Sequence, residues 1–125
     1  MRVISKARLR EFWQARRQGD AKGPLQAWFT HVNNRTVSWK NWGDVRGDFS
    51  TASLVGNCVV FNIAGNKYRL ITRILYASHK VFVLQVLTHV DYDRNQWKAI
   101  CGCFDPPPAK SARTSNPIRF RNQKK

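Results

Sequence analysis

Residues 57–87 read NCVVFNIAGNKYRLITRILYASHKVFVLQVL, and this stretch decides the fold. Three runs in it are rich in β-branched and aromatic residues, a composition that favours strands, at positions 57–63, 67–75 and 80–87. Ala64-Gly65-Asn66 suits a tight turn, because Gly and Asn tolerate positive φ, and Ser78-His79 marks a second turn. We therefore predict an antiparallel meander of three strands.

Two helices are predicted ahead of the meander in the sequence. A short strand at residues 1–4 precedes a helix that starts after Ser5, a candidate N-cap, and ends near Gly19. A second helix has Pro24 in its first turn and an apolar stripe at i, i+3, i+4 and i+7, formed by Leu25, Trp28, Phe29 and Val32. Residues 35–53 predict a short helix and a loop. The fold class is thus α+β, with N-terminal helices packed on a small antiparallel sheet.

Charge is the strongest feature of the composition. The chain of 125 residues has 22 Lys and Arg against 7 Asp and Glu, a formal net charge of +15. Such a charge opposes compaction, and a polyanion such as nucleic acid, a ribosome or an anionic membrane would relieve it. Residues 106–125 contain six basic and no acidic residues and begin with three prolines, which predicts a flexible basic tail. Subtracting six from +15 leaves +9 on residues 1–105, the predicted folded domain.

Apolar runs and cysteines bear on the location of the protein. No apolar run approaches the roughly 18–20 residues of a spanning helix, and the residues after Met1 lack the core of a signal peptide. We therefore expect a cytoplasmic protein with no membrane partner. Cys58, Cys101 and Cys103 are an odd set with poor zinc spacing, so we expect reduced structural thiols, no disulfide framework and no metal or other cofactor.

Alternation along residues 67–74 separates basic from apolar side chains. We predict that the basic set projects from the open face of the sheet; it consists of Lys67, Arg69 and Arg73. The apolar set is expected to face the helices; it consists of Tyr68, Leu70 and Ile74. Clustered guanidinium groups would bind phosphate through paired hydrogen bonds, whereas a solvated face of isolated charges is the alternative. On the next strand, we expect Gln85 and Leu87 to share the face of Val81 and Val83.

Residues 88–93 read THVDYD and are predicted to open a short helix that runs to about Ile100. Thr88 would be its N-cap, with Asp91 at the capping-box position. His89, Tyr92 and Asp93 would then be neighbours, because residues three and four apart meet on a helix. The backbone N–H groups at this helix start favour a bound phosphate.

These groups are sufficient for RNA cleavage without a metal. A base takes the proton of a 2′-hydroxyl, a cation stabilises the phosphorane-like charge, and an acid protonates the leaving 5′-oxygen. We assign His89 as base or acid, Tyr92 as its partner or as a substrate positioner, and Arg69 and Arg73 as the electrostatic clamp. A structural role for His89 is the alternative.

The same residues resemble a known family. VFNIAGNKYRL at 60–70, residues 83–87 and THVDYD at 88–93 resemble the HigB toxins of type II toxin–antitoxin systems, as do RVIS at 2–5 and the region of Leu25 and Trp28. The resemblance spans roughly residues 2–97. The residues that match the family pattern by motif position are Asn62, Asn66, Lys67, Arg69, His89, Tyr92 and Asp93. We expect RNA contacts from Lys67, Asn62, Asn66, Asp93 and Gln85.

The resemblance implies a RelE-like fold and metal-independent endoribonuclease activity on mRNA, generally on translating ribosomes, with inhibition of translation and growth. It also implies a HigA-type antitoxin partner with a helix-turn-helix domain, so that operator DNA is bound only through the antitoxin. The tail after Phe104 departs from the compact ending of the family, and it could contact rRNA, cover part of the antitoxin surface or be dispensable. A non-catalytic RNA- or ribosome-binding protein is the alternative function, and a DNA-binding module is a third, although the chain has no clear helix-turn-helix.

Overall fold

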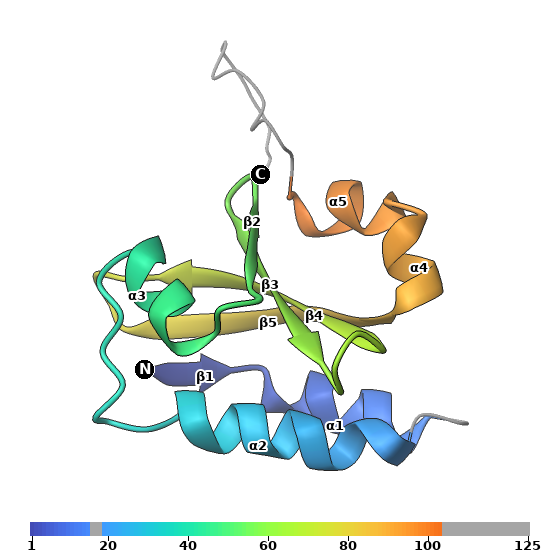
Figure 1. Ribbon diagram of the computed structural model, residues 1–125, viewed down its shortest axis with the longest axis horizontal. Coiled ribbons are helices and arrows are strands. Elements are labelled where there is room, and N and C mark those ends of the chain that lie inside the picture. Colours follow the sequence, from blue (N-terminus) through green and yellow to red (C-terminus); the bar gives the residue numbers. More distant parts are fainter. Residues whose placement is uncertain (16–18, 104–125) are drawn as a thin grey trace, which may run out of the picture.

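The computed structural model describes residues 1–15 and 19–103 (Figure 1). Its elements, in chain order, are β1 (Arg2–Ile4), α1 (Lys6–Gln14), the 3-10 helix η1 (Gly19–Ala21), α2 (Lys22–Val32), α3 (Trp42–Asp48), β2 (Ser53–Val55), β3 (Cys58–Ile63), β4 (Tyr68–Leu75), β5 (Lys80–Thr88), α4 (His89–Asp93) and α5 (Gln96–Cys101). The predicted domain boundary at residue 105 and the predicted basic tail lie outside the described residues. Within the described residues, no helix is long and apolar enough to cross a membrane.

A single five-stranded sheet has the order β1-β5-β4-β3-β2. The predicted meander of β3, β4 and β5 is confirmed, and the α+β class with it. The sheet is mixed rather than purely antiparallel, because β1 pairs in parallel with β5, with Arg2 beside Lys80. β2 pairs antiparallel with β3 and was not predicted, since three residues are too few to show a periodic pattern.

The helices α1 and α2 lie side by side on one face of the sheet (Figure 1). The stripe predicted on α2 is buried at Leu25, Trp28 and Val32, and Phe29 is half-buried against the same core. The prediction that Tyr68, Leu70 and Ile74 face these helices is also confirmed. α1 ends at Gln14, earlier than predicted, and Ser5 makes no side-chain cap.

α4 and α5 lie on the other side of the sheet (Figure 1). The single helix predicted from residue 88 to about 100 is divided in two, because Asn95 takes a left-handed backbone conformation with φ 64°. The predicted N-cap is confirmed, since Thr88 Oγ1 accepts the Asp91 N–H at 3.2 Å. Trp97 of α5 is buried against a second hydrophobic cluster that includes Ile71 and Leu87.

A disulfide joins Cys58 of β3 to Cys103, which follows α5. The prediction of reduced thiols is therefore wrong for these two residues, and Cys101 alone is a free thiol. The two cysteines are 45 residues apart in sequence, but their Cα atoms are 5.4 Å apart because α5 folds back over the sheet. The bond links α5 to β3.

A β-bulge in β5 changes which side chains share a face. The ladder passes from Ile71↔Gln85 directly to Thr72↔Val83, so Leu84 is an extra residue on β5. Alternation is interrupted there, and Gln85 and Leu87 lie on the face away from α1 and α2. The prediction that they share the face of Val81 and Val83 is wrong.

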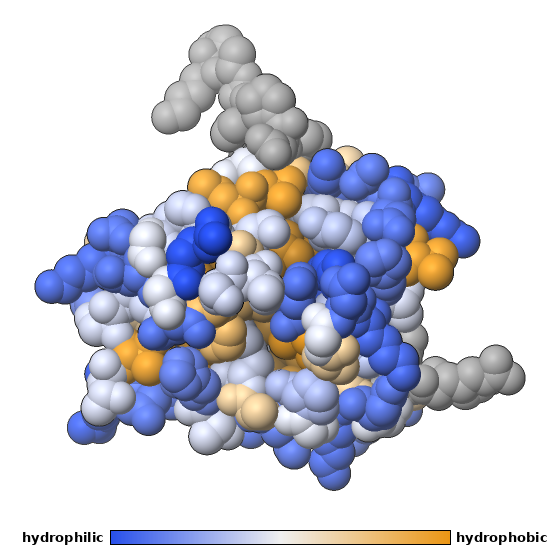
Figure 2. Space-filling view, in the orientation of Figure 1, coloured by the Kyte–Doolittle hydropathy of each residue, from blue (hydrophilic) through white to orange (hydrophobic). Residues whose placement is uncertain are grey.

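The outer surface is mostly hydrophilic in the view of Figure 2, and its hydrophobic side chains form separate patches. The large exposed apolar residues come from different elements or their ends: Leu54, Leu75, Val90 and Ile100. Scattered apolar side chains of this kind are normal for a folded domain and do not define a docking face.

Candidate functional site

The start of α4, the β3–β4 turn and the start of β4 meet at one corner of the sheet. The His89 N–H donates to the Lys67 carbonyl at 3.1 Å, which holds the first turn of α4 against the β3–β4 turn. The Arg69 guanidinium lies over the Tyr92 ring, 5.2 Å from its centroid. The structure thus brings His89, Tyr92 and Arg69 together, as the sequence analysis expected.

Arg69 is buried beneath this corner, with 8% of its surface exposed. Its Nη1 donates to the Asn66 carbonyl at 2.9 Å, and its Nη2 donates to Asn66 Oδ1 at 2.6 Å. The expectation of an open basic face is therefore wrong at Arg69, because α4 covers this part of the sheet. Asn66, in the β3–β4 turn, fixes the orientation of the guanidinium.

Arg73 lies on the same face as Arg69 but contacts α5 instead of α4. Its Nη2 donates to the Cys101 carbonyl at 3.0 Å, and its buried Nε has no hydrogen-bond partner within the described residues. A Cβ at Gly102 would lie 3.2 Å from Nη2, so this glycine gives the guanidinium room. Arg73 is four positions further along β4 than Arg69, a distance of roughly 13 Å. The structure therefore does not bring Arg73 into the corner of His89.

Lys67 turns toward the helix layer rather than joining the two arginines. Its Nζ forms an ion pair with the carboxylate of Asp20 in η1, and the Tyr68 hydroxyl donates to the same carboxylate. The prediction that Lys67, Arg69 and Arg73 share one face is therefore wrong for Lys67. Hydrogen bonds from Lys67 and then Tyr68 lower the pKa of Asp20, and the hydrogen bond to Asp20 raises the pKa of Lys67.

His89 is exposed at the corner, with 45% of its side chain accessible. Its Nε2 lies 3.2 Å from Asp93 Oδ2, one turn further along α4. Two N–H groups at this helix start are used within the protein, since His89 donates to Lys67 and Asp91 donates to Thr88. Fewer backbone N–H groups at the start of α4 are therefore free to contact a phosphate than the sequence predicted.

Tyr92 lies between Arg69 and Trp97. Its ring stacks on the Trp97 indole, with centroids 5.1 Å apart and planes at 15°, and its carbonyl accepts the Trp97 Nε1–H at 2.9 Å. Burial raises the pKa of the Tyr92 hydroxyl, and the neighbouring Arg69 charge only partly opposes this. The hydroxyl is therefore protonated at neutral pH and can donate a hydrogen bond.

The remaining predicted contacts are divided between the corner and α5. Asn62 is directly opposite Arg69 in the β3–β4 ladder, so the two residues share a face. Gln85 is instead close to the free thiol of Cys101, with Sγ and Oε1 3.6 Å apart. Asp20 was missed by the sequence analysis, because 47 residues separate it from Lys67 and no local pattern connects them.

The fold and this corner define a class of small, basic α+β proteins. At the corner, an imidazole is paired with a carboxylate, and a stacked tyrosine lies against a buried arginine. The family model of the HigB toxin, described as the RelE-like toxic component of a toxin–antitoxin system, matches residues 21–95. The chain belongs to this family, and an antitoxin is therefore its implied partner. Among the curated proteins, none matches the chain.

Proposed function

We propose that this toxin is a metal-independent endoribonuclease that cleaves mRNA in the cytoplasm, on the translating ribosome, and thereby inhibits translation and growth. One observation carries the proposal: an exposed imidazole, His89, is held by a carboxylate 3.2 Å away at a corner that also contains Tyr92 and Arg69. Membership of a toxin family supports it.

In the proposed reaction, the Asp93 carboxylate beside His89 Nε2 favours a proton on that nitrogen and orients the ring, which leaves Nδ1 for proton transfer. The 2′-oxygen attacks the adjacent phosphorus as its proton goes to a base, and the bond from phosphorus to the 5′-oxygen breaks as that oxygen is protonated. The products are a 2′,3′-cyclic phosphate and a 5′-hydroxyl end. His89 serves as base or acid, and the protonated Tyr92 hydroxyl positions the substrate or donates to the leaving oxygen.

Arg69 is buried and Lys67 is exposed, so we assign them different roles. Arg69 is fixed beneath Tyr92 with few free donors, so it contributes a positive potential from a site of low dielectric rather than a direct clamp. Lys67, with 61% of its side chain exposed, is the proposed direct phosphate contact at the corner. Asn62 lies opposite Arg69 on β3 and is proposed as a further RNA contact. Arg73 and Gln85 hold α5 in place, and Asn66 positions Arg69.

The proposed antitoxin is of the HigA type, with a helix-turn-helix domain through which the complex binds operator DNA. Neutralisation by the product of an adjacent gene is the expected consequence. Co-expression of a short neighbouring reading frame should restore growth, and failure of every neighbouring frame to do so would reject this choice of partner.

The decisive experiment compares two histidines in similar settings. His89 and His31 are 45% and 50% exposed, and each faces a carboxylate, at 3.2 Å from Asp93 and 3.7 Å from Asp48. Wild type, His89→Asn and His31→Asn are induced, and new 5′-ends in cellular mRNA are mapped. We expect His89→Asn to reduce cleavage by about 10²-fold or more, as for loss of a general acid or base, and His31→Asn to cleave like wild type.

Two outcomes would contradict the proposal in different ways. Arrest of translation by the wild type without new mRNA ends would favour the alternative, a non-catalytic RNA- or ribosome-binding protein. New ends that persist unchanged in a folded His89→Asn variant would keep the endoribonuclease but reject His89 as its acid or base. Circular dichroism of both variants establishes that they are folded.

A further inference from the structure

A basic pocket of about 360 Å³ lies where β1 and the β4–β5 turn meet the segment after α2. Its polar lining comes from Arg2, Arg35, Ser38, Ser78 and His79. We infer that this pocket binds a backbone phosphate of RNA and is a second RNA contact of the toxin, separate from the corner of His89. The inference rests on the proposed function in so far as the RNA is the one that the corner cleaves.

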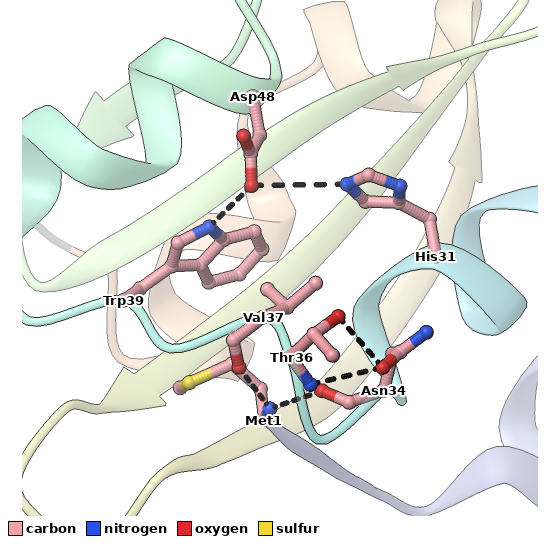
Figure 3. Close-up of polar contacts among 7 residues, drawn as sticks. All are labelled: Met1, His31, Asn34, Thr36, Val37, Trp39 and Asp48. Carbon is pink, nitrogen blue, oxygen red and sulfur yellow. Dashed lines mark hydrogen bonds and ion pairs between the residues drawn. The ribbon is translucent and has the colours of Figure 1, made fainter.

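Hydrogen bonds hold together the backbone segments that carry Arg2 and Arg35. The Arg2 N–H donates to the His79 carbonyl at 2.7 Å, and the Val3 N–H donates to Asn33 Oδ1 at 3.0 Å. The main-chain nitrogen of Met1 donates to the carbonyls of Asn34 and Val37, which ties the segment containing Arg35 to β1 (Figure 3). The pocket is thus built from a strand, a turn and a loop that are bonded to one another.

The charges around the pocket have the same sign. Arg2 and Lys80 are partners in the parallel β1–β5 ladder, so two like charges lie on neighbouring strands beside the pocket. Within the described residues, no acidic side chain lines the pocket, and neither Arg2 nor Arg35 has an ion-pair partner. A bound phosphate would satisfy both guanidinium groups and accept from the two serine hydroxyls.

A second pocket shares Val37 and Ser38 with this one, and its two acidic residues, Asp44 and Asp48, already have partners. Asp48 accepts from Trp39 Nε1 at 2.9 Å and lies 3.7 Å from His31 Nε2 (Figure 3). Asp44 accepts the Lys40 N–H at 2.8 Å. These carboxylates are therefore held by their own surroundings, and the positive charge of Arg2 and Arg35 remains available to a ligand.

The distance to His89 is within the reach of a single RNA strand. β5 runs from Lys80, beside the pocket, to Thr88, beside His89, and nine strand residues span roughly 27 Å. At about 3.4 Å per stacked nucleotide, one strand of about eight nucleotides would reach from one site to the other. A polynucleotide can therefore occupy both sites at once, and it matches the charge of +9 on residues 1–105.

The test measures binding without cleavage. The probe is an RNA of about 12 nucleotides with 2′-O-methyl groups, which block the attacking oxygen, and its Kd is measured over a series of salt concentrations. Each phosphate of the single strand that the protein no longer neutralises should reduce the slope of log K against log salt by about 0.7. We expect this reduction for Arg2→Gln/Arg35→Gln. The control Arg10→Gln/Arg46→Gln removes the same charge from exposed sites elsewhere and should keep the wild-type slope.

A second variant separates charge from geometry. Arg2→Lys/Arg35→Lys keeps the positive charges but loses the forked donors, so it should keep the salt slope and bind more weakly. Equal slopes and affinities for wild type and Arg2→Gln/Arg35→Gln would overturn the inference. The inference would also be overturned if inorganic phosphate binding depended on Arg35 but RNA binding did not.

Failure of this inference is distinguishable from failure of the proposed function. If no new mRNA ends form but the RNA slope depends on Arg2 and Arg35, the endoribonuclease is rejected and the pocket stands. If new ends form and the slope is unchanged in the variant, only the pocket is rejected.

Discussion

The two faces of the sheet are packed in different ways. The face under α1 and α2 has a continuous core in which the Phe61 ring contacts Trp28, Phe49 and Trp39, with centroids 5.1–6.3 Å apart. The face under α4 and α5 has a smaller apolar cluster, a disulfide and two arginines. The comparison indicates that the first face supplies most of the stability, whereas the second face carries the charged groups of the candidate site.

The second face depends on hydrogen bonds because it buries charge. A buried guanidinium is costly unless its donors have partners. Asn66 accepts two hydrogen bonds from Arg69, and the Cys101 carbonyl accepts one from Arg73. The helices α4 and α5 and the Cys58–Cys103 disulfide cover this second face. We expect the second face to stabilise the fold less per residue than the first face, but it keeps cations close to the exposed imidazole of His89.

The largest expected effect is at the centre of the first face. Phe61→Ala removes a side chain that is 1% exposed and contacts three aromatic rings. It should lower the free energy of unfolding by about 3–5 kcal/mol, because buried apolar surface is removed and a cavity is left unfilled. Urea denaturation measures this decrease, and a value below about 1 kcal/mol would contradict the assignment of the main core to this face.

A smaller effect is expected from the covalent link of the second face. Cys58→Ser/Cys103→Ser should lower the free energy of unfolding by about 2–4 kcal/mol, because the bond closes a long loop in the unfolded chain. Cys101→Ser, which removes the free thiol, is the matched control and should leave the bond intact. Melting with and without reductant measures the effect, and a wild-type Tm that does not respond to reductant would show that the bond contributes nothing. A decrease larger than that of Phe61→Ala would reverse the ranking of the two faces.

The smallest effect concerns Asp20, which connects the helix layer to the start of β4. Hydrogen bonds from Lys67 and Tyr68 lower the pKa of its carboxyl below the ordinary 3.8. A group with a lowered pKa in the folded state contributes stability above its unfolded pKa and loses it as the pH falls through the folded value. Asp20→Asn should therefore lower the Tm at neutral pH, and its difference from wild type should shrink below about pH 4. An unchanged difference between pH 7 and about pH 3 would contradict this contribution.

Local sequence patterns determined the strands of the meander and the buried stripe of α2. The predicted runs 57–63, 67–75 and 80–87 agree within one residue with β3, β4 and β5. The Thr88 cap and the proximity of His89 to Tyr92 also follow from spacing along the chain. These features are determined locally, because β-branched alternation, turn residues and helical periodicity act over a few residues.

Only the tertiary structure decided the parallel pairing of β1 with β5, the Cys58–Cys103 bond and the ion pair between Asp20 and Lys67. It also decided that Arg69 is buried, because α4 and α5 cover a face that alternation alone leaves open. Each of these contacts joins residues that are far apart in sequence or depends on how one element covers another. Local periodicity contains no information about such contacts, so they form only when the chain packs.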